Sequence, residues 1–202
     1  MRDLSRTLSR ARVVPVIREE TGPRAIAVVR RLHDAGFGCI ELTTTVPGWA
    51  EALGTLRQDL PSLTLAVGTI ACMDDATAAV DAGADFLVSP HAAPGVREVA
   101  SRAEVPLVEG GLTPTEIAAA AAHGPAKLFP AHLGGPRYLR DLLTVMPQAQ
   151  IMPTGGITPE EITAWLEAGA VAVGVGSALA GRSDLADLAQ RLLHTNLTRE
   201  TS

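Results

Sequence analysis

The sequence predicts an α/β protein, a (β/α)8 TIM barrel in a single domain. Eight short apolar runs alternate with longer segments of helical character along the 202 residues, and no composition shift divides the chain. Chemically active residue types follow many of the runs. The first run lacks the Gly-x-Gly-x-x-Gly motif of a dinucleotide-binding sheet. Residues 1–11 are predicted to form a helical extension ahead of the barrel, and residues 195–202 a frayed polar tail.

The strands are expected where short runs of Val, Ile and Leu lack any polar alternation. Such runs are typical of parallel strands that are buried on both faces. They lie at residues 13–17, 39–42, 65–67, 86–88, 106–108, 127–129, 151–152 and 171–175.

The helices are expected between these runs, where Ala, Leu, Glu and Arg are frequent. A threonine followed by a proline indicates a helix start, because the hydroxyl caps the first turn and proline suits the first helical position. Two such starts occur, at Thr113-Pro114 and Thr158-Pro159. A glycine directly after a helical segment indicates a helix end. Three such ends occur, at Gly36, Gly83 and Gly169.

The composition argues against several partners. The formal net charge of −5 and the 3% aromatic content make nucleic acid an unlikely ligand. The apolar runs are too short to span a membrane, and the first residues lack the apolar core of a secretion signal. Cys39 and Cys72 have no cluster of His or Cys around them, so we expect free thiols and no metal site. A cytoplasmic protein is therefore expected.

Lys127 is the only lysine of the chain, since the other 16 of its 17 basic residues are arginines. It lies in the apolar run Ala126-Lys127-Leu128-Phe129, and an apolar environment disfavours the charged ammonium. A neutral amine attacks a carbonyl, which a guanidinium cannot do. Lys127 is thus either a nucleophile that forms a Schiff base or a lysine whose ammonium reaches water from a strand end.

Glu41 directly follows apolar residues in the second predicted strand. In a barrel, side chains at the carboxyl ends of strands face the active-site mouth. A carboxylate there can shuttle protons. The alternative is an ion pair with an arginine, but a barrel interior has few groups that satisfy a carboxylate, which favours the proton shuttle.

Small hydroxyls and glycines follow other strands. Thr69 and Thr154 are candidates to hold a substrate carboxylate, or are ordinary turn hydroxyls. The last two predicted strands are followed by glycines, whose backbone N–H groups can approach an anion. Each segment alone is also consistent with an ordinary turn, but together Thr154-Gly155-Gly156 and Gly174-Val175-Gly176-Ser177 predict a phosphate site.

Six motifs at predicted strands share a pattern: Glu41-Leu42-Thr43, Val67-Gly68-Thr69, Ser89-Pro90, Lys127-Leu128-Phe129-Pro130-Ala131, Pro153-Thr154-Gly155-Gly156-Ile157 and Gly174-Val175-Gly176-Ser177-Ala178. Over about residues 12–181 the sequence resembles the 2-keto-3-deoxy-6-phosphogluconate (KDPG) aldolases, which include the 4-hydroxy-2-oxoglutarate (KHG) and phosphogalactonate aldolases.

The resemblance implies a class I aldolase that splits KDPG, a sugar-acid phosphate, into pyruvate and glyceraldehyde 3-phosphate. Lys127 would form the Schiff base, and Glu41 would be the general acid and base. Thr69, Thr154 and Arg18 would hold the substrate carboxylate, and the glycines and Ser177 the phosphate. The resemblance also implies a homotrimer that needs no metal or cofactor and serves Entner–Doudoroff carbohydrate metabolism.

The sequence departs from the family at two positions. Some members carry an arginine four residues after the catalytic glutamate, where this chain has Thr45. A family proline–glycine pair after the fifth strand is Glu109-Gly110 here, which adds a negative charge near an anion site unless an arginine pairs with it. The alternatives left open are a phosphogalactonate aldolase and a phosphosugar-binding barrel, either epimerase-like or catalytically silent.

Overall fold

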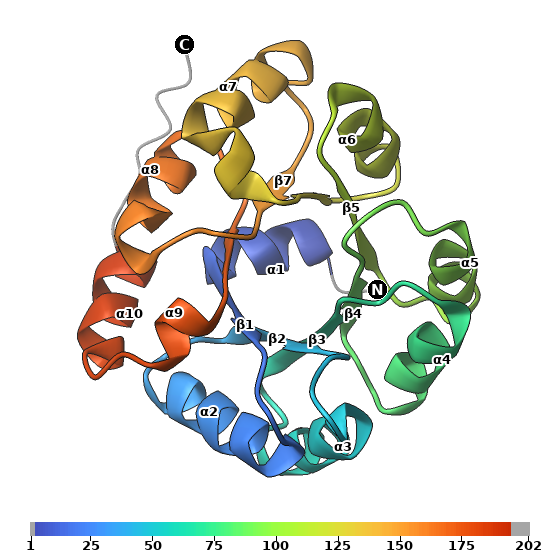
Figure 1. Ribbon diagram of the computed structural model, residues 1–202, viewed down its shortest axis with the longest axis vertical. Helices are drawn as coiled ribbons and strands as arrows, with labels where there is room; N and C mark the ends of the chain where they lie inside the picture. Colours follow the sequence, from blue (N-terminus) through green and yellow to red (C-terminus); the bar gives the residue numbers. More distant parts are fainter. Residues whose placement is uncertain (1–2, 195–202) are drawn as a thin grey trace.

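The computed structural model describes residues 3–194, and its eight strands form one parallel sheet inside a ring of helices (Figure 1). The strands follow the spatial order β7-β6-β5-β4-β3-β2-β1-β8. A parallel bridge between Thr154 and Gly174 joins the two ends of this order and closes the barrel. The predicted (β/α)8 fold is confirmed. The predicted tail at 195–202 lies outside the described residues.

The strands lie close to their predicted positions. Their bounds are β1 Val13–Ile17, β2 Cys39–Thr43, β3 Thr64–Gly68, β4 Phe86–Val88, β5 Leu107–Gly111, β6 Ala126–Leu128, β7 Ile151–Pro153 and β8 Val173–Val175. The prediction was wrong at several strand ends. The strands β2, β3 and β5 continue into polar or glycine residues, because the backbone ladder does not depend on apolar side chains.

The helices that separate the strands are α2 Gly22–Asp34, α3 Trp49–Asp59, α4 Met73–Asp81, α5 Pro94–Arg102, α6 Pro114–Ala121, α7 Gly135–Val145 and α8 Ile162–Glu167. Two more, α9 Ser177–Ala180 and α10 Leu185–His194, follow the last strand. Two short 3₁₀ helices, η1 Ala131–Leu133 and η2 Pro159–Glu161, precede α7 and α8. The predicted start at Thr113 is confirmed, since its hydroxyl accepts a hydrogen bond from the Glu116 N–H in a capping box.

The strands separate two apolar layers, because successive side chains of a strand point to opposite faces. The outer layer lies between the sheet and the helices and includes Ile40, Leu42, Leu65 and Leu128. The inner layer fills the lower part of the barrel. Its members are Val14, Cys39, Ala66, Phe86, Val88, Val108, Met152, Val171 and Ala172.

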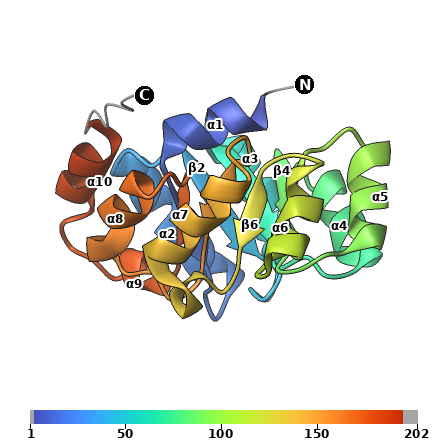
Figure 2. The same cartoon turned by 90° about the horizontal axis from the view of Figure 1, so that it is seen from above.

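Helix α1, Leu4–Ala11, lies across one end of the barrel (Figure 2). Asp3 caps it by accepting a hydrogen bond from the Arg6 N–H, and Leu4 and Leu8 on its buried face join the inner layer. The helix therefore closes the end of the barrel where the strands begin. The catalytic side chains must lie toward the opposite end, where the strands finish.

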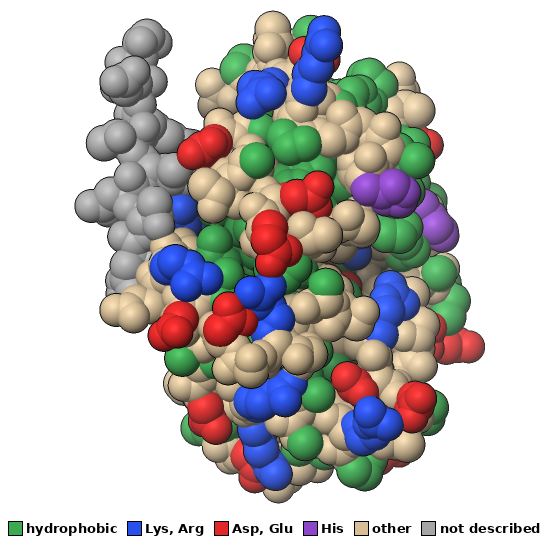
Figure 3. Space-filling view, turned by 60° about the vertical axis from the view of Figure 1, so that its left-hand side comes forward, with side chains coloured by type: hydrophobic (Ala, Val, Ile, Leu, Met, Phe, Trp, Pro, Cys, Tyr) green, Lys and Arg blue, Asp and Glu red, His purple; other side chains and the backbone are tan. Residues whose placement is uncertain are grey.

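The surface shows no concentration of one charge on the face in Figure 3, where acidic and basic side chains are interspersed. Within residues 3–194, no helix combines the length and apolar character needed to cross a bilayer.

Candidate active site

Lys127 and Glu41 meet inside the barrel. Lys127 lies in the middle of β6, where its neighbours Ala126 and Leu128 pack outward into the helical layer, so its own side chain points inward. Glu41 has the same inward direction on β2. The Lys127 Nζ is 3.6 Å from the Glu41 Oε1, and the two side chains are only 3% and 0% exposed. The structure thus brings together the two residues predicted to carry the chemistry.

The Glu41 carboxylate has few other partners. Among the described residues, neither of its oxygens accepts a conventional hydrogen bond. A buried ion pair without further hydrogen bonds is poorly compensated for lost hydration. The pair is therefore well suited to transfer a proton when a substrate arrives.

Gly68 makes room for this carboxylate. A Cβ built at Gly68 on β3 would lie 1.8 Å from the Glu41 Oε1, so any side chain there would displace the acid. The sequence reading placed Gly68 at a strand end but missed this packing role. The close approach of Gly68 to Glu41 follows from the register of β2 and β3, in which Thr43 pairs with Gly68 and Glu41 pairs with Ala66.

Phe129 was also missed as a site residue. The Lys127 Nζ lies 5.4 Å from the centre of the Phe129 ring, within reach of the ring face. The ring also occupies the space beside Gly155, where a Cβ would lie 2.9 Å from it. The aromatic residue two positions after the lysine thus links the catalytic strand to the glycine turn.

Thr154 follows β7 and offers an unused hydroxyl. Its Oγ1 is buried and, within the part of the chain that the structure describes, has no hydrogen-bond partner. Gly174 on β8 accommodates it, because a Cβ there would lie 2.3 Å from the Thr154 Oγ1. A buried hydroxyl without a partner is available to a ligand.

Thr69 and Arg18 meet at the same end of the barrel. The Arg18 Nη2 donates to the Thr69 Oγ1 at 3.1 Å, and the Arg18 Nη1 donates to the Thr45 Oγ1 at 3.4 Å. Thr69 has a φ of 64°, a conformation that costs a β-branched residue about 1–3 kcal/mol and is found mainly at functional sites. An arginine side chain therefore occupies the region around Thr45.

The predicted phosphate residues lie on two neighbouring loops, which the bridge between Thr154 and Gly174 places side by side. Gly155 and Gly156 have φ values of 98° and 72°, and a Cβ at Gly156 would lie 2.6 Å from the His132 Nδ1. Gly176 has open space around its Cα, and Ser177 begins the four-residue helix α9.

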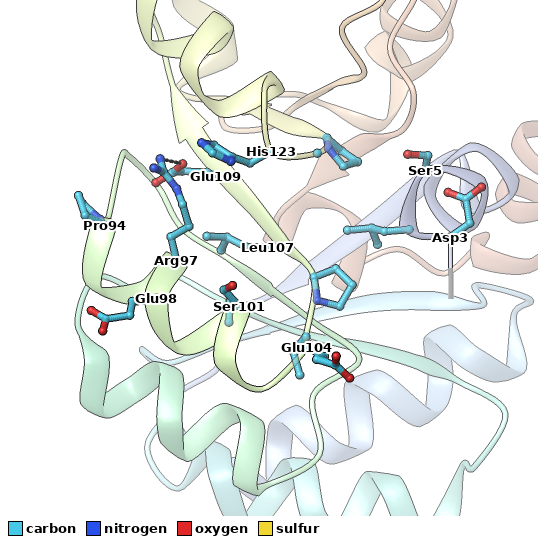
Figure 4. A pocket seen from close by; sticks show the side chains of 16 residues that line it. Asp3, Ser5, Pro94, Arg97, Glu98, Ser101, Glu104, Leu107, Glu109 and His123 are labelled. Atoms are coloured by element: carbon cyan, nitrogen blue, oxygen red, sulfur yellow. Dashed lines mark hydrogen bonds and ion pairs between the residues drawn. The ribbon is translucent and has the colours of Figure 1, made fainter. Parts of the chain in front are cut away.

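Glu109 does not face the barrel mouth. It points outward from β5, where Arg97 of α5 forms an ion pair with it (Figure 4). The Ala93 N–H also donates a hydrogen bond to its Oε1 at 2.8 Å. Arg97 is therefore the arginine that the sequence analysis required as a partner for Glu109, and the charge of Glu109 is paired. A cavity of about 930 Å³ borders this ion pair between α5 and residues 123–125, away from Lys127.

Cys39 lies on β2 in the inner layer, on the same face as Glu41. Burial raises the pKa of its thiol to about 12, and the negative charge of Glu41 adds to this effect. The thiol is neutral at physiological pH and acts as a small apolar side chain. Across residues 3–194, no three His, Cys, Asp or Glu side chains are grouped so that they could hold a metal ion.

The fold and the site define an eight-stranded barrel that holds a buried amine beside a carboxylate. A profile of the KDPG and KHG aldolase family matches residues 4–191. The chain belongs to this family.

Individual relatives agree with this assignment. The 2-dehydro-3-deoxy-phosphogluconate aldolase of Treponema pallidum is 35% identical over 74% of this chain and 73% of its own length. The 2-dehydro-3-deoxy-6-phosphogalactonate aldolase of Escherichia coli is 29% identical over 85% of this chain and 86% of its own. A KDPG aldolase from Legionella pneumophila, solved with pyruvate captured as a covalent carbinolamine, is 26% identical, with a TM-score of 0.81 over 94% of this chain and 95% of that one.

Proposed function

We propose that this chain is a Schiff-base aldolase, an aldehyde-lyase that cleaves KDPG to pyruvate and glyceraldehyde 3-phosphate. The observation that carries the proposal is the buried pair of the Lys127 Nζ and the Glu41 Oε1, 3.6 Å apart. A carbinolamine with pyruvate has been captured in the Legionella relative, and such an adduct requires an amine in this role.

Lys127 begins the reaction. The Lys127 ammonium first passes its proton to Glu41, and the resulting amine adds to the C2 carbonyl of the keto acid. Glu41 then returns this proton to the hydroxyl of the carbinolamine, and loss of water gives an iminium. The iminium accepts the electron pair released when the bond between C3 and C4 breaks, which leaves an enamine of pyruvate. Phe129 beside the Nζ stabilises the positive charge of the iminium through its ring face.

Glu41 moves the protons. It takes the proton of the C4 hydroxyl as the bond between C3 and C4 breaks and the aldehyde forms, and it then returns a proton to C3 of the enamine. Water hydrolyses the resulting iminium and releases pyruvate. Because its carboxylate lies beside the amine, the same group serves each of these transfers without a large movement.

The remaining predicted residues hold the two ends of the substrate. We propose that Arg18, Thr69 and Thr154 bind the carboxylate, which is supported by the unused Thr154 hydroxyl and by the cationic Arg18. The phosphate is proposed to bind to backbone N–H groups at Gly155, Gly156, Gly176 and Ser177, which is supported by the two adjacent glycine turns.

The expected assembly is a homotrimer in the cytoplasm, as part of Entner–Doudoroff metabolism. Leu133 and Val145, close to the two ends of α7, are 64% and 70% exposed and offer apolar surface to another copy. A sugar-acid phosphate is charged and does not cross a membrane, so the enzyme must share the compartment in which the ester is made. Light scattering should give three times the chain mass of 21.0 kDa. The mass of a single chain would contradict the trimer.

The decisive experiment combines turnover with trapping. Purified protein is assayed for pyruvate release from KDPG, its galactonate epimer and 4-hydroxy-2-oxoglutarate, and is then treated with pyruvate and borohydride. We expect the fastest turnover with KDPG and a reduced adduct on Lys127, whereas Lys127→Arg should lose about a thousandfold or more in kcat because a guanidinium forms no imine. An unlabelled Lys127, or a fully active Lys127→Arg protein, would contradict the Schiff-base mechanism.

A further inference from the structure

The Arg18 guanidinium is held by two threonine hydroxyls at the barrel mouth. Its Nη2 donates to the Thr69 Oγ1 at 3.1 Å and its Nη1 to the Thr45 Oγ1 at 3.4 Å. Arg18 is itself exposed, so nothing in its burial fixes its direction. These two hydrogen bonds determine where the cation points.

Thr45 is in turn held by Thr43. The Thr43 hydroxyl donates its only proton to the Ile17 carbonyl at 2.8 Å, so its oxygen accepts from the Thr45 hydroxyl at 2.7 Å. The Thr45 oxygen is then free to accept from Arg18. The Thr43 and Thr45 hydroxyls therefore each donate one hydrogen bond and accept one.

These hydrogen bonds form a closed ring. Ile17 is the last residue of β1, and Arg18 follows it directly. The ring runs from the Arg18 side chain through Thr45 and Thr43 to the Ile17 carbonyl, and the backbone then returns to Arg18. Thr43 is fully buried, which gives the ring a fixed base. The guanidinium is thereby tied to its own backbone.

We propose that Thr45 is a positioning residue that holds Arg18 ready for the substrate carboxylate, with Thr43 as its anchor. This inference rests on the proposed role of Arg18. A free arginine side chain must lose rotamer freedom when it binds an anion, and an arginine held in place beforehand loses less. The ring therefore raises affinity for the substrate without taking part in bond breaking.

The test compares Thr45→Val, which keeps the shape of the side chain but removes the hydroxyl, with Thr45→Ser, which keeps the hydroxyl. Loss of one such hydrogen bond should raise the KM for KDPG by about three- to tenfold. The value of kcat should hardly change, because Thr45 touches no reacting atom. Thr45→Ser should behave as the wild type. The control is Thr55→Val, which removes an exposed hydroxyl that bonds only to the Glu51 carbonyl of its own helix.

A double variant distinguishes an effect of Thr45 on the position of Arg18 from a general loss of folded structure. If Thr45 acts through Arg18, adding Thr45→Val to Arg18→Ala should raise the KM no further. The pyruvate concentration that half-saturates borohydride trapping should rise with the KM in Thr45→Val, because pyruvate carries the carboxylate but no phosphate. Melting temperatures of all variants should stay close to that of the wild type.

The unfavourable outcomes are distinct. A raised KM in Arg18→Ala with an unchanged KM in Thr45→Val would overturn the positioning role and leave Arg18 as a substrate ligand. An unchanged KM in Arg18→Ala would overturn both roles. If KDPG binding weakens in Thr45→Val but pyruvate trapping does not, the carboxylate is not the group that Arg18 meets, and the proposal is overturned in that form.

Discussion

At the scale of single residues, the proposed chemistry depends on one contact, between the Lys127 Nζ and the Glu41 carboxylate. Lys127 and Glu41 come from β6 and β2, and their approach is permitted by the missing side chain of a third strand, at Gly68. The proposed catalytic pair therefore depends on a residue that carries no functional group.

Gly68→Ala should disable the enzyme without unfolding it. The new methyl group would overlap the Glu41 carboxylate and force it away from the lysine by about 1 Å or more, a displacement that typically lowers kcat by about a hundredfold. The matched control is Gly54→Ala in α3, where a Cβ meets no described atom within 4 Å. Steady-state kinetics checks both variants. A kcat near the wild-type value in Gly68→Ala would show that the position of Glu41 matters little.

At the scale of elements, helix α1 and the barrel interior form one packing unit. Leu4 and Leu8 reach the same apolar cluster as Phe86 and Met152, although α1 is not one of the repeating βα units. A short helix thus covers the end of the barrel opposite the proposed active site.

Leu8→Ala should lower the free energy of unfolding by about 2–5 kcal/mol, since Leu8 is fully buried and its loss leaves a cavity. The value of kcat at a temperature where the variant stays folded should be close to that of the wild type, because α1 lies at the other end of the barrel. Ser9→Ala, on the exposed side of the same helix, is the control. Urea denaturation measures the free energy of unfolding of both variants. Equal values would show that the packing of α1 against the barrel contributes little to stability.

At the scale of the whole molecule, the outer face of the sheet packs against the helices, and the inner face carries the proposed active site. Outward side chains such as Glu109 pack against helices, whereas the inward side chains of Lys127 and Glu41 form the proposed active site. Changes on the two faces of one strand should therefore have different effects.

Glu109→Gln tests this separation. It removes the charge of the ion pair with Arg97 while keeping an acceptor for the Ala93 N–H, so we expect the free energy of unfolding to fall by about 1–2 kcal/mol with the KM for KDPG unchanged. Glu98→Gln, in an exposed pair with Arg102, should change the stability by about 0.5 kcal/mol or less. A raised KM in Glu109→Gln would show that this carboxylate acts on the substrate after all.

Much of this architecture could be read from the sequence. The eight runs predicted the strands, and the solitary lysine, Glu41 and the glycine turns predicted the residues of the mouth. The direction of Glu109 could not be predicted, because strands that are apolar on both faces do not reveal which alternate residues point inward. The role of Gly68 depends on the register between two strands, which one sequence does not encode locally.

Helix α1 covers the barrel end where the strands begin, so we expect substrate and products to pass through the opposite end. Of the two products, the one that is not bonded to Lys127 is then expected to leave first. In the proposed mechanism that product is the aldehyde, because the pyruvate half is still bonded to Lys127 as the enamine. In the reverse direction pyruvate must enter before the aldehyde, and an aldehyde that arrives too early blocks the passage.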